Sequence, residues 1–231
     1  INKNTAVILI SGNAVSIPWG SKVKSIVQSW YLGSEAGTAL ASILSGEINP
    51  SGKLPFTFPK KLSDNAAHYY GTLSYPGDGE NQYYKEDILV GYRWHDTKKI
   101  TPQYAFGHGR SYTKFNLSNI ILDKKKYKLT DSIKISCSVE NTGSVQGAEV
   151  VQVYIGKEKS KVNRALKELK GFKKLSLLKG ESKTIEIHIP VGELAFYDEA
   201  ISDWNIEKGE YVVFIGNASD NISKKIKITV I

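Results

Sequence analysis

The stretch NPSGKLPFTFPKKL, residues 49–62, divides the chain into two parts with different sequence patterns. Pro50 and Gly52 predict a tight turn, because proline fixes φ and glycine tolerates conformations that other residues avoid. Residues 54–58 alternate in polarity and predict a last strand for the part of the chain before it. The two later prolines suit a strand edge or end, since proline has no N–H to donate. The stretch therefore predicts the end of one domain.

The part before this stretch has the pattern of an α/β domain. TAVILIS, residues 5–11, is a continuous apolar run and predicts a strand buried on both faces. SKVKSIVQSWYL, residues 21–32, predicts a short helix or a helix followed by a strand. SEAGTALASILSGE, residues 34–47, predicts a helix with Ser34 as its N-cap and Gly46 at its C-terminal end. We expect residues 1–60 to form the C-terminal part of an α/β sandwich domain.

The part after the stretch is first aromatic and then all-β. Eight of the thirteen tyrosines fall between Tyr69 and Tyr112, which predicts a functional or domain-wrapping linker over residues 61–113. From residue 115 onward, seven short alternating runs are separated by turn sequences such as NTGS and LKGE. Residues 114–231 are therefore predicted to form an immunoglobulin-like or fibronectin type III-like β-sandwich. The runs are FNLSNIILD, SIKISCSVEN, AEVVQVYIG, LKGFKKLSL, KTIEIHIPV, YVVFIGN and KKIKITVI.

Length, charge and termini restrict the classes of protein. A chain of 231 residues is long enough to bury a sizeable core. It begins with Ile and contains no Met, so we expect a fragment or a processed product. The net charge of +8 is diluted by 23 acidic residues, and the lysine runs at 124–126 and 224–227 lack interleaved aromatics. We expect no nucleic-acid partner and, without an apolar run of about 18 residues, no membrane span.

Cysteine and histidine usage predicts no metal or cofactor. The single Cys137 excludes an internal disulfide, and its alternation with Ile133 and Ile135 predicts a buried structural thiol rather than a nucleophile. The histidines lack the spacing that brings two imidazoles to one ion, and no serine elbow or phosphate-cradling loop occurs. GHGRS, residues 107–111, predicts a tight turn. The histidines are His68, His95, His108 and His188.

The acidic residues of the first half are candidates for glycosidase carboxylates, since that chemistry needs two carboxyl groups that flank one bond. Glu86 and Asp87 stand out because they lie in the aromatic segment QYYKEDILVGYRWHD, residues 82–96. On a strand they would point to opposite faces, so they do not predict a working pair. A structural role is favoured for Glu86, as a partner of Arg93 or of a backbone donor. The other acids are Glu35, Glu47, Asp64, Asp78, Glu80 and Asp96.

Several aromatic residues of the first half are able to stack on sugar rings, although packing is the favoured role for each one singly. They are Trp19, Trp30, Tyr31, Tyr83, Tyr84 and Trp94.

Four long segments of the chain resemble a known enzyme family. They are VILISGNAVSIPW, SIVQSWYLGSEAGTALASILSGEINPSGKLPFTFP, YKEDILVGYRWHDTKKITPQYAFGHGRSYTKF and VQVYIGKEKSKVNRALKELKGFKKLSLLKGES. In this order they resemble the C-terminal half of glycoside hydrolase family 3 β-glycosidases, particularly the bacterial β-glucosidase type. The resemblance implies an N-terminal (β/α)8 barrel, an α/β sandwich domain, a linker and a fibronectin type III-like domain, of which this chain lacks the barrel.

The resemblance also implies where the chemistry occurs. The family's nucleophile is an Asp on the barrel, and its acid/base is a Glu on a sandwich-domain loop that precedes the equivalent of residues 5–11. Neither position exists here, so no catalytic, cofactor-binding or metal-binding residue is assigned, and substrate-binding residues stay unknown. The chain departs from the family pattern at Ser34, where Gln is usual, and at Asp87, where Gly is usual. At Asp87 the backbone is expected to need the freedom of glycine.

The expected function is that of a non-catalytic C-terminal portion of a retaining β-glucosidase. Its partners would be the missing N-terminal barrel half and, for the intact enzyme, a β-linked gluco-oligosaccharide or an aryl glucoside. β-Xyloside hydrolysis is the second choice. The resemblance points to a bacterial enzyme, and periplasmic, extracellular and cytoplasmic locations all agree with it. The N-glycosylation sequons at 116–118, 217–219 and 221–223 would matter only in a eukaryotic secretory pathway.

Two alternatives remain open from the sequence. One is a free-standing carbohydrate-binding or adhesion module, which needs an exposed row of aromatics on the β-sandwich. The other is an incomplete gene product whose strand at residues 5–11 lacks neighbours and leaves unpaired edges. Most aromatics of the sandwich alternate as core residues do; they are Tyr154, Phe172, Phe196, Tyr197, Trp204, Tyr211 and Phe214.

Overall fold

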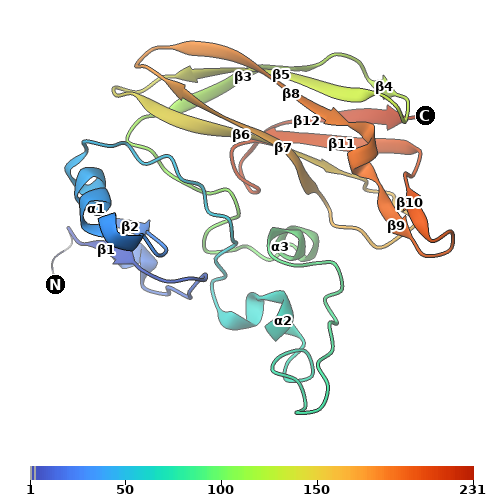
Figure 1. The fold of residues 1–231 in the computed structure, drawn as a ribbon, viewed down its shortest axis with the longest axis horizontal. Helices are drawn as coiled ribbons and strands as arrows, with labels where there is room; N and C mark the ends of the chain where they lie inside the picture. Colours follow the sequence, from blue (N-terminus) through green and yellow to red (C-terminus); the bar gives the residue numbers. More distant parts are fainter. Residues whose placement is uncertain (1, 3) are drawn as a thin grey trace. The chain divides into compact units, whose positions relative to one another are not determined.

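The computed structural model describes residues 2 and 4–231 of the chain (Figure 1). The chain forms two compact units, which we call unit 1 (Ile1–His108) and unit 2 (Gly109–Ile231). The finer division at residues 60 and 113 stays a prediction. None of the helices in the described part of the chain is both long and apolar enough to cross a membrane.

The first part of unit 1 is a small parallel βα arrangement. Strand β1 (Ala6–Leu9) pairs in parallel with β2 (Ser25–Gln28), and a 3-10 turn, η1 (Gly20–Lys22), precedes β2. The predicted strand at residues 5–11 and the helix-to-strand alternative for residues 21–32 are therefore confirmed. The expected burial of β1 on both faces is wrong, because its residues are exposed or half-buried. Strand β2 is its only partner among the described residues.

Helix α1 (Ala36–Ser45) confirms the predicted helix and follows the 3-10 turn η2 (Gly33–Glu35). Gly46 ends it in the left-handed conformation with φ of 81°, as predicted. The predicted N-cap is wrong, since Ser34 lies inside η2 and the N-cap position is Glu35, whose side chain makes no capping hydrogen bond. No residue of α1 is fully buried, and its apolar stripe is at most half-buried.

The stretch at residues 54–58 does not form the predicted strand and contains a bend at residues 55–56. Among the described residues, its only β-bridge is the isolated antiparallel one between Phe58 and Tyr104. The N–H of Leu54 donates to the carbonyl of His108 at 2.8 Å, and the N–H of Phe58 donates to that of Tyr104 at 2.8 Å. The prolines at 55 and 59 have no N–H, which prevents a continuous ladder. The end of unit 1 thus returns to pair with this stretch.

The aromatic segment of unit 1 builds a small core around Trp94. It contains η3 (Leu62–Asp64), α2 (Ala66–Tyr69) and α3 (Tyr92–Lys98). Trp94 is fully buried, and its ring lies 5.1 Å from that of Tyr69 and 5.8 Å from that of Tyr70. Its indole N–H donates to the carbonyl of Asp64 at 3.1 Å. The segment is therefore locally folded.

Unit 2 is a two-layer β-sandwich, and all seven predicted runs are strands (Figure 1). The five-stranded sheet has the order β4-β12-β11-β6-β7, and the three-stranded sheet has the order β3-β5-β8. Two short strands, β9 and β10, form a separate hairpin after the 3-10 turn η4. The elements are β3 (Phe115–Leu122), β4 (Lys126–Tyr127), β5 (Ser132–Asn141), β6 (Gly147–Gly156), β7 (Glu168–Leu177), β8 (Ser182–Pro190), η4 (Val191–Leu194), β9 (Phe196–Asp198), β10 (Asp203–Asn205), β11 (Gly209–Gly216) and β12 (Ile222–Val230).

The core of unit 2 follows from the alternation of its strands. Along β5, the buried side chains Ile133, Ile135, Cys137 and Val139 all lie on one face. They belong to a cluster of twenty buried residues, all from unit 2. Cys137 is a buried free thiol, as predicted, and burial raises its pKa to about 11. A thiol with so high a pKa is protonated at neutral pH and packs as an apolar residue.

Candidate functional site

Three acidic residues of unit 1 make hydrogen bonds to groups close to them in sequence. The carboxylate of Glu35 accepts a hydrogen bond from Thr38 at 2.9 Å, and that of Glu47 accepts one from Ser42 at 3.0 Å. Asp78 accepts backbone N–H groups in its own turn, and the N–H of Asn81 is the main cause of a pKa below the ordinary value. Local hydrogen bonds of this kind indicate a structural role for these three carboxylates.

Glu86 and Asp87 lie in a turn before α3, so their expected placement on a strand is wrong. Glu86 is 7% exposed, and its Oε2 has no hydrogen-bond partner among the described residues, so this oxygen makes neither of the expected pairings. Asp87 has φ of 56°, the left-handed region that favours glycine. The expectation that this position needs the freedom of glycine is confirmed.

The histidines have separate surroundings. The Nδ1 atom of His95 lies 3.0 Å from the carbonyl oxygen of Ile100, and His188 lies 3.3 Å from Glu186. The ring of His68 lies 4.9 Å from that of Tyr75. Within residues 2 and 4–231, no three His, Cys, Asp or Glu side chains are grouped closely enough to hold a metal ion.

The aromatic candidates of unit 1 divide into packed and exposed residues. Trp94 is buried, and Trp30 packs edge-on against Phe56 and Phe58, as the packing role predicts. Trp19 is half-buried. The three tyrosines are exposed: Tyr31 at 77%, Tyr83 at 46% and Tyr84 at 73%.

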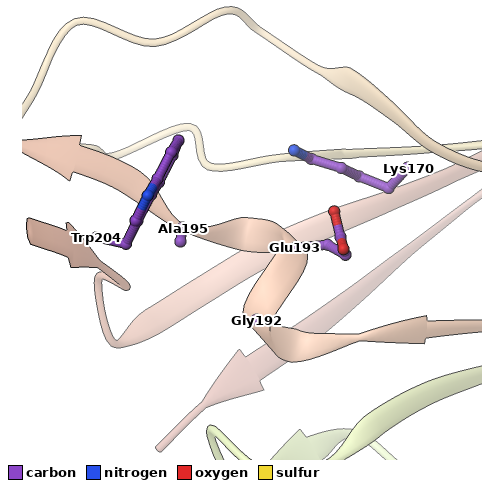
Figure 2. A pocket seen from close by; sticks show the side chains of 5 residues that line it. All are labelled: Lys170, Gly192, Glu193, Ala195 and Trp204. Atoms are coloured by element: carbon purple, nitrogen blue, oxygen red, sulfur yellow. The ribbon is translucent and has the colours of Figure 1, made fainter.

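Unit 2 contains a hollow of about 390 Å³ beside an exposed tryptophan (Figure 2). It lies between β7, η4 and the β9–β10 hairpin, and it is lined by Lys170, Gly192, Glu193, Ala195 and Trp204. The side chain of Trp204 is 67% exposed. In Figure 2 its ring is seen edge-on, and one face is turned across Ala195 toward Glu193 and Lys170.

The aromatic side chains of the sandwich are partly buried and partly exposed, and the alternation of the sequence predicted only the buried ones. Tyr154, Tyr211 and Phe214 are buried, as expected. In contrast, Trp204 and Tyr197 are more than half exposed, and so is Phe172 on β7. Trp204 and Tyr197 were missed because strands of three residues are too short for alternation to assign a face. The aromatic pair Tyr197 and Trp204, opposite each other in a hairpin, is the signal that was available.

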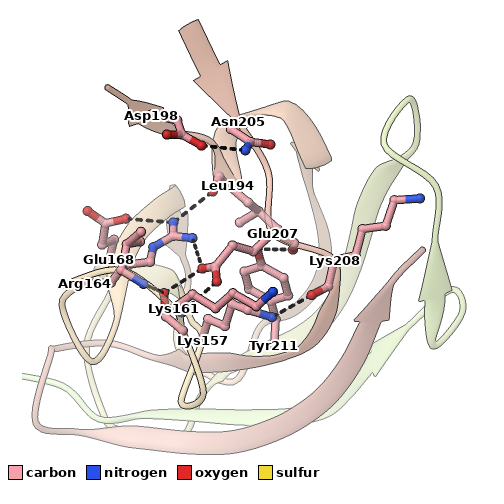
Figure 3. Close-up of polar contacts among 12 residues, drawn as sticks. Lys157, Lys161, Arg164, Glu168, Leu194, Asp198, Asn205, Glu207, Lys208 and Tyr211 are labelled. Atoms are coloured by element: carbon pink, nitrogen blue, oxygen red, sulfur yellow. Dashed lines mark hydrogen bonds and ion pairs between the residues drawn. The ribbon is translucent and has the colours of Figure 1, made fainter. Parts of the chain in front are cut away.

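A charged cluster around Arg164 holds the elements that carry the hollow (Figure 3). The Nη2 atom of Arg164 donates to the carbonyl of Leu194, at the end of η4, at 2.8 Å. Its guanidinium lies 3.7 Å from the carboxylate of Glu207 and 3.9 Å from that of Glu168. The side chain of Arg164 is only 11% exposed, so these contacts are largely shielded from water.

Glu207 is the acceptor that orders the loop at residues 157–167. It accepts hydrogen bonds from the N–H of Lys161 at 2.8 Å and from the hydroxyl of Ser160 at 2.6 Å. Burial tends to raise the pKa of this carboxyl, but these donors, with Lys157 and Arg164, hold it below its ordinary value. Glu207 is therefore ionised at neutral pH and anchors the loop.

Two family models match the chain. Residues 1–112 match the glycosyl hydrolase family 3 C-terminal domain, and residues 149–219 match the fibronectin type III-like domain. These matches agree with the α/β pattern of unit 1 and with the sandwich of unit 2.

Curated relatives support the same family. The chain is 49% identical over 222 residues to the β-glucosidase BoGH3A of Bacteroides ovatus, which covers 96% of this chain and 30% of that protein. It is 44% identical over 230 residues to the thermostable β-glucosidase B of Acetivibrio thermocellus, which covers all of this chain and 30% of that protein. The chain thus spans about 30% of the length of these relatives.

Solved structures resemble the whole chain. The β-glucosidase DesR of Streptomyces venezuelae superposes with a TM-score of 0.93 at 36% identity, over 100% of this chain and 29% of that one. A family 3 β-glucosidase of Bifidobacterium adolescentis superposes with a TM-score of 0.92 at 36% identity, over 99% of this chain and 33% of that one. The chain therefore belongs to glycoside hydrolase family 3 and corresponds to the C-terminal portion of its β-glucosidases.

Proposed function

We propose that this chain serves as the non-catalytic C-terminal portion of a β-glucosidase and completes its structure together with an N-terminal portion. The observation that carries the proposal is the open α/β part of unit 1. The strands β1 and β2 form a parallel sheet of two strands, and no residue of α1 is buried. Parallel sheets are normally larger and covered on both faces. Further strands and helices from another part of the protein would cover these surfaces.

The catalytic carboxylates are proposed to lie outside the chain. Retaining glycosidases hold two carboxyl groups about 5 Å apart, one on each side of the bond that breaks. The acids of unit 1 with assigned contacts serve turns and helix ends instead, as Glu35, Glu47 and Asp78 do. The family resemblance supplies the nucleophile from a barrel and the acid/base from a loop that precedes β1. In this proposal residues 1–60 end the sandwich domain, 61–113 link it, and 114–231 form the last domain.

The proposed substrate of the intact enzyme is a β-glucoside. The support for it is that the relatives named above are β-glucosidases. The linkage would break by double displacement with retention of configuration. The chain would contribute to the reaction indirectly, because it would stabilise the part of the enzyme that carries the catalytic carboxylates.

A chimera tests this function. This chain replaces the matching 230 residues of the β-glucosidase B of Acetivibrio thermocellus, and hydrolysis of an aryl β-glucoside is measured with an aryl β-xyloside in parallel. We expect the chimera to hydrolyse the glucoside, the relative without its C-terminal portion to be inactive, and this chain alone to match buffer. The expectation rests on the similarity of fold across the whole chain.

The controls separate the two parts of the proposal. Hydrolysis by this chain alone, at a rate near that of the chimera, would show that the chain carries catalytic carboxylates of its own. An inactive chimera that is folded by circular dichroism would contradict the proposed completion by the N-terminal portion. Faster hydrolysis of the xyloside than of the glucoside would overturn the substrate.

A further inference from the structure

The exposure of the aromatic side chains beside the hollow is not explained by a role in the core. Burial of a tryptophan side chain is one of the most favourable contributions to a core, yet 67% of Trp204 is exposed. The neighbouring Tyr197 is 54% exposed. Two large aromatics that are exposed at one place mark a candidate interaction or ligand-binding surface.

The ring of Trp204 is held in a fixed orientation. Tyr197 is its cross-strand neighbour in the β9–β10 hairpin, and the two ring centroids lie 5.9 Å apart at 83°. This edge-to-face contact leaves a face of the indole free. The side-chain amide of Asn205 donates to Asp198 at 2.9 Å and ties the two strands of the hairpin together. The aromatic face is thus presented by a braced element.

The opposite side of the hollow is polar and has balanced charge. Glu193, on η4, contributes a carboxylate, and Lys170, on β7, contributes an ammonium group (Figure 2). Lys170 lies 3.3 Å from the carboxylate of Glu168, which orients its side chain. A hollow with one positive and one negative group offers both donors and acceptors without a net charge that would select an ionic ligand.

The cluster around Arg164 keeps these two sides together. Arg164 donates to the carbonyl of Leu194, which follows Glu193 in η4 (Figure 3). Its guanidinium also lies 5.7 Å from the ring of Phe196 on β9. One buried side chain therefore contacts both the turn that carries the carboxylate and the hairpin that carries the tryptophan. A site held in this way loses little conformational entropy when a ligand binds.

We propose that this hollow is a binding site for a β-linked gluco-oligosaccharide, with one pyranose ring stacked on Trp204. In a β-glucosyl ring the hydroxyl groups are equatorial, so the axial C–H groups form each face of the ring. These C–H groups are slightly positive and match the negative face of an indole. The ring's hydroxyl groups both donate and accept, which fits Lys170 and Glu193. A volume of about 390 Å³ lies in the range of small-ligand sites.

Nuclear magnetic resonance of the indole N–H groups tests the proposal on the whole 231-residue chain. The chain has four tryptophans, and the Trp204→Phe variant assigns the signal of Trp204. On titration with cellotetraose we expect a saturable shift of that signal, while the signals of Trp19, Trp30 and Trp94 stay in place. Sorbitol is the matched ligand control, since it has hydroxyl groups but no ring face, and it should cause no saturable shift.

Variants supply the second part of the test, with binding followed by the shifts of backbone signals around Ala195. Trp204→Ala should weaken cellotetraose binding at least about tenfold, and Trp204→Phe by a smaller factor because it keeps a ring. Phe172→Ala is the control, since Phe172 is 66% exposed but does not line the hollow. It should leave the affinity unchanged.

Three results would overturn the site. They are the absence of a saturable shift of the Trp204 signal, an equal response to sorbitol, and unchanged affinity in a folded Trp204→Ala variant. A shift of the Trp204 signal with protein concentration alone would assign the surface to contacts between copies of the chain instead. The titration requires no hydrolysis, so its outcome does not depend on the chimera.

Discussion

The two units of this chain have cores of different kinds. The core of unit 2 contains twenty buried residues drawn from both sheets of the sandwich and from η4. In the described part of unit 1, the buried hydrophobic residues are only Ile17, Phe58, Ala66, Leu89, Trp94 and Ala105, and none of them lies in β1, β2 or α1. Apolar burial is the main favourable contribution to folding. The difference indicates that unit 2 is a complete folding unit and that the α/β part of unit 1 depends on further structure.

The largest expected effect comes from separation of the units. Residues 109–231 alone should unfold in one cooperative transition in urea. Residues 1–108 alone should show no cooperative transition, because no residue of α1 is fully buried in them. Circular dichroism and tryptophan fluorescence measure both transitions. A cooperative transition of residues 1–108 with a midpoint near that of residues 109–231 would remove the distinction between the units.

Two adjacent isoleucines test how far the core of unit 2 dominates its stability. Ile120 is 4% exposed and Ile121 is 59% exposed, on the same strand β3. Ile120→Ala should lower the free energy of unfolding by about 3 kcal/mol through the lost burial and the cavity left behind. Ile121→Ala is the matched control and should change it by less than about 0.5 kcal/mol. Similar losses in urea titrations of both variants would contradict the assigned core.

The charged cluster of unit 2 should contribute less than its core. Arg164→Ala removes the hydrogen bond to Leu194 and leaves Glu207 without its nearest guanidinium, at an expected cost of about 2 kcal/mol. Arg164→Lys keeps the charge but not the planar group, and it should recover only part of the loss. Full recovery by lysine in urea titrations would show that charge alone matters here.

The same cluster predicts a dependence on pH. The folded-state pKa of Glu207 lies below its ordinary value of 4.5. Ionised Glu207 therefore stabilises the folded state above about pH 4.5, and this contribution is lost as the pH falls through the folded-state pKa. Glu207→Gln should reduce the decline of stability below pH 4.5, measured by thermal unfolding across pH 3–7. An unchanged pH profile in this variant would place the acid sensitivity elsewhere in the chain.

The smallest expected effect is a gain in unit 1. Lys99 ends α3 with φ of 56°, a conformation that costs an L-residue about 1 kcal/mol and that glycine adopts freely. Lys99→Gly should therefore raise stability by up to about 1 kcal/mol. Lys98→Gly, at the last residue of the helix, is the control and should lower stability by up to about 1 kcal/mol. Thermal unfolding of the 231-residue chain measures both, and a loss with Lys99→Gly would contradict the assigned backbone conformation.

The sequence predicted the sandwich well because its strands are long. Runs such as Ser132–Asn141 alternate over ten residues, so their inward faces are apparent without knowledge of their partners. The short strands β4, β9 and β10 were missed because two or three residues carry no periodicity. The predicted strand at residues 54–58 failed because its prolines interrupt the ladder with residues 104–108, a partner distant in sequence.

Burial in unit 1 was predicted less well, for a different reason. The apolar run at residues 5–11 shows that β1 is suited to the interior of a parallel sheet. It does not show whether the neighbouring strands are present, and here β1 is only half-covered. The candidate site of unit 2 could not be predicted because the exposure of Tyr197 and Trp204 depends on a hairpin of two three-residue strands. Local backbone conformation was predicted better than burial, since Gly46 and Asp87 both have the positive φ that was expected.

Native-state hydrogen exchange of the 231-residue chain, read by mass spectrometry, compares the two units in one experiment. We expect the amides of β6 and β11 in unit 2 to exchange only through global unfolding. Those of β1, β2 and α1 in unit 1 should exchange at least about a hundredfold faster, through local opening of the uncovered α/β part. Equal protection of β1 and β6 would contradict the conclusion that unit 1 depends on further structure for its stability.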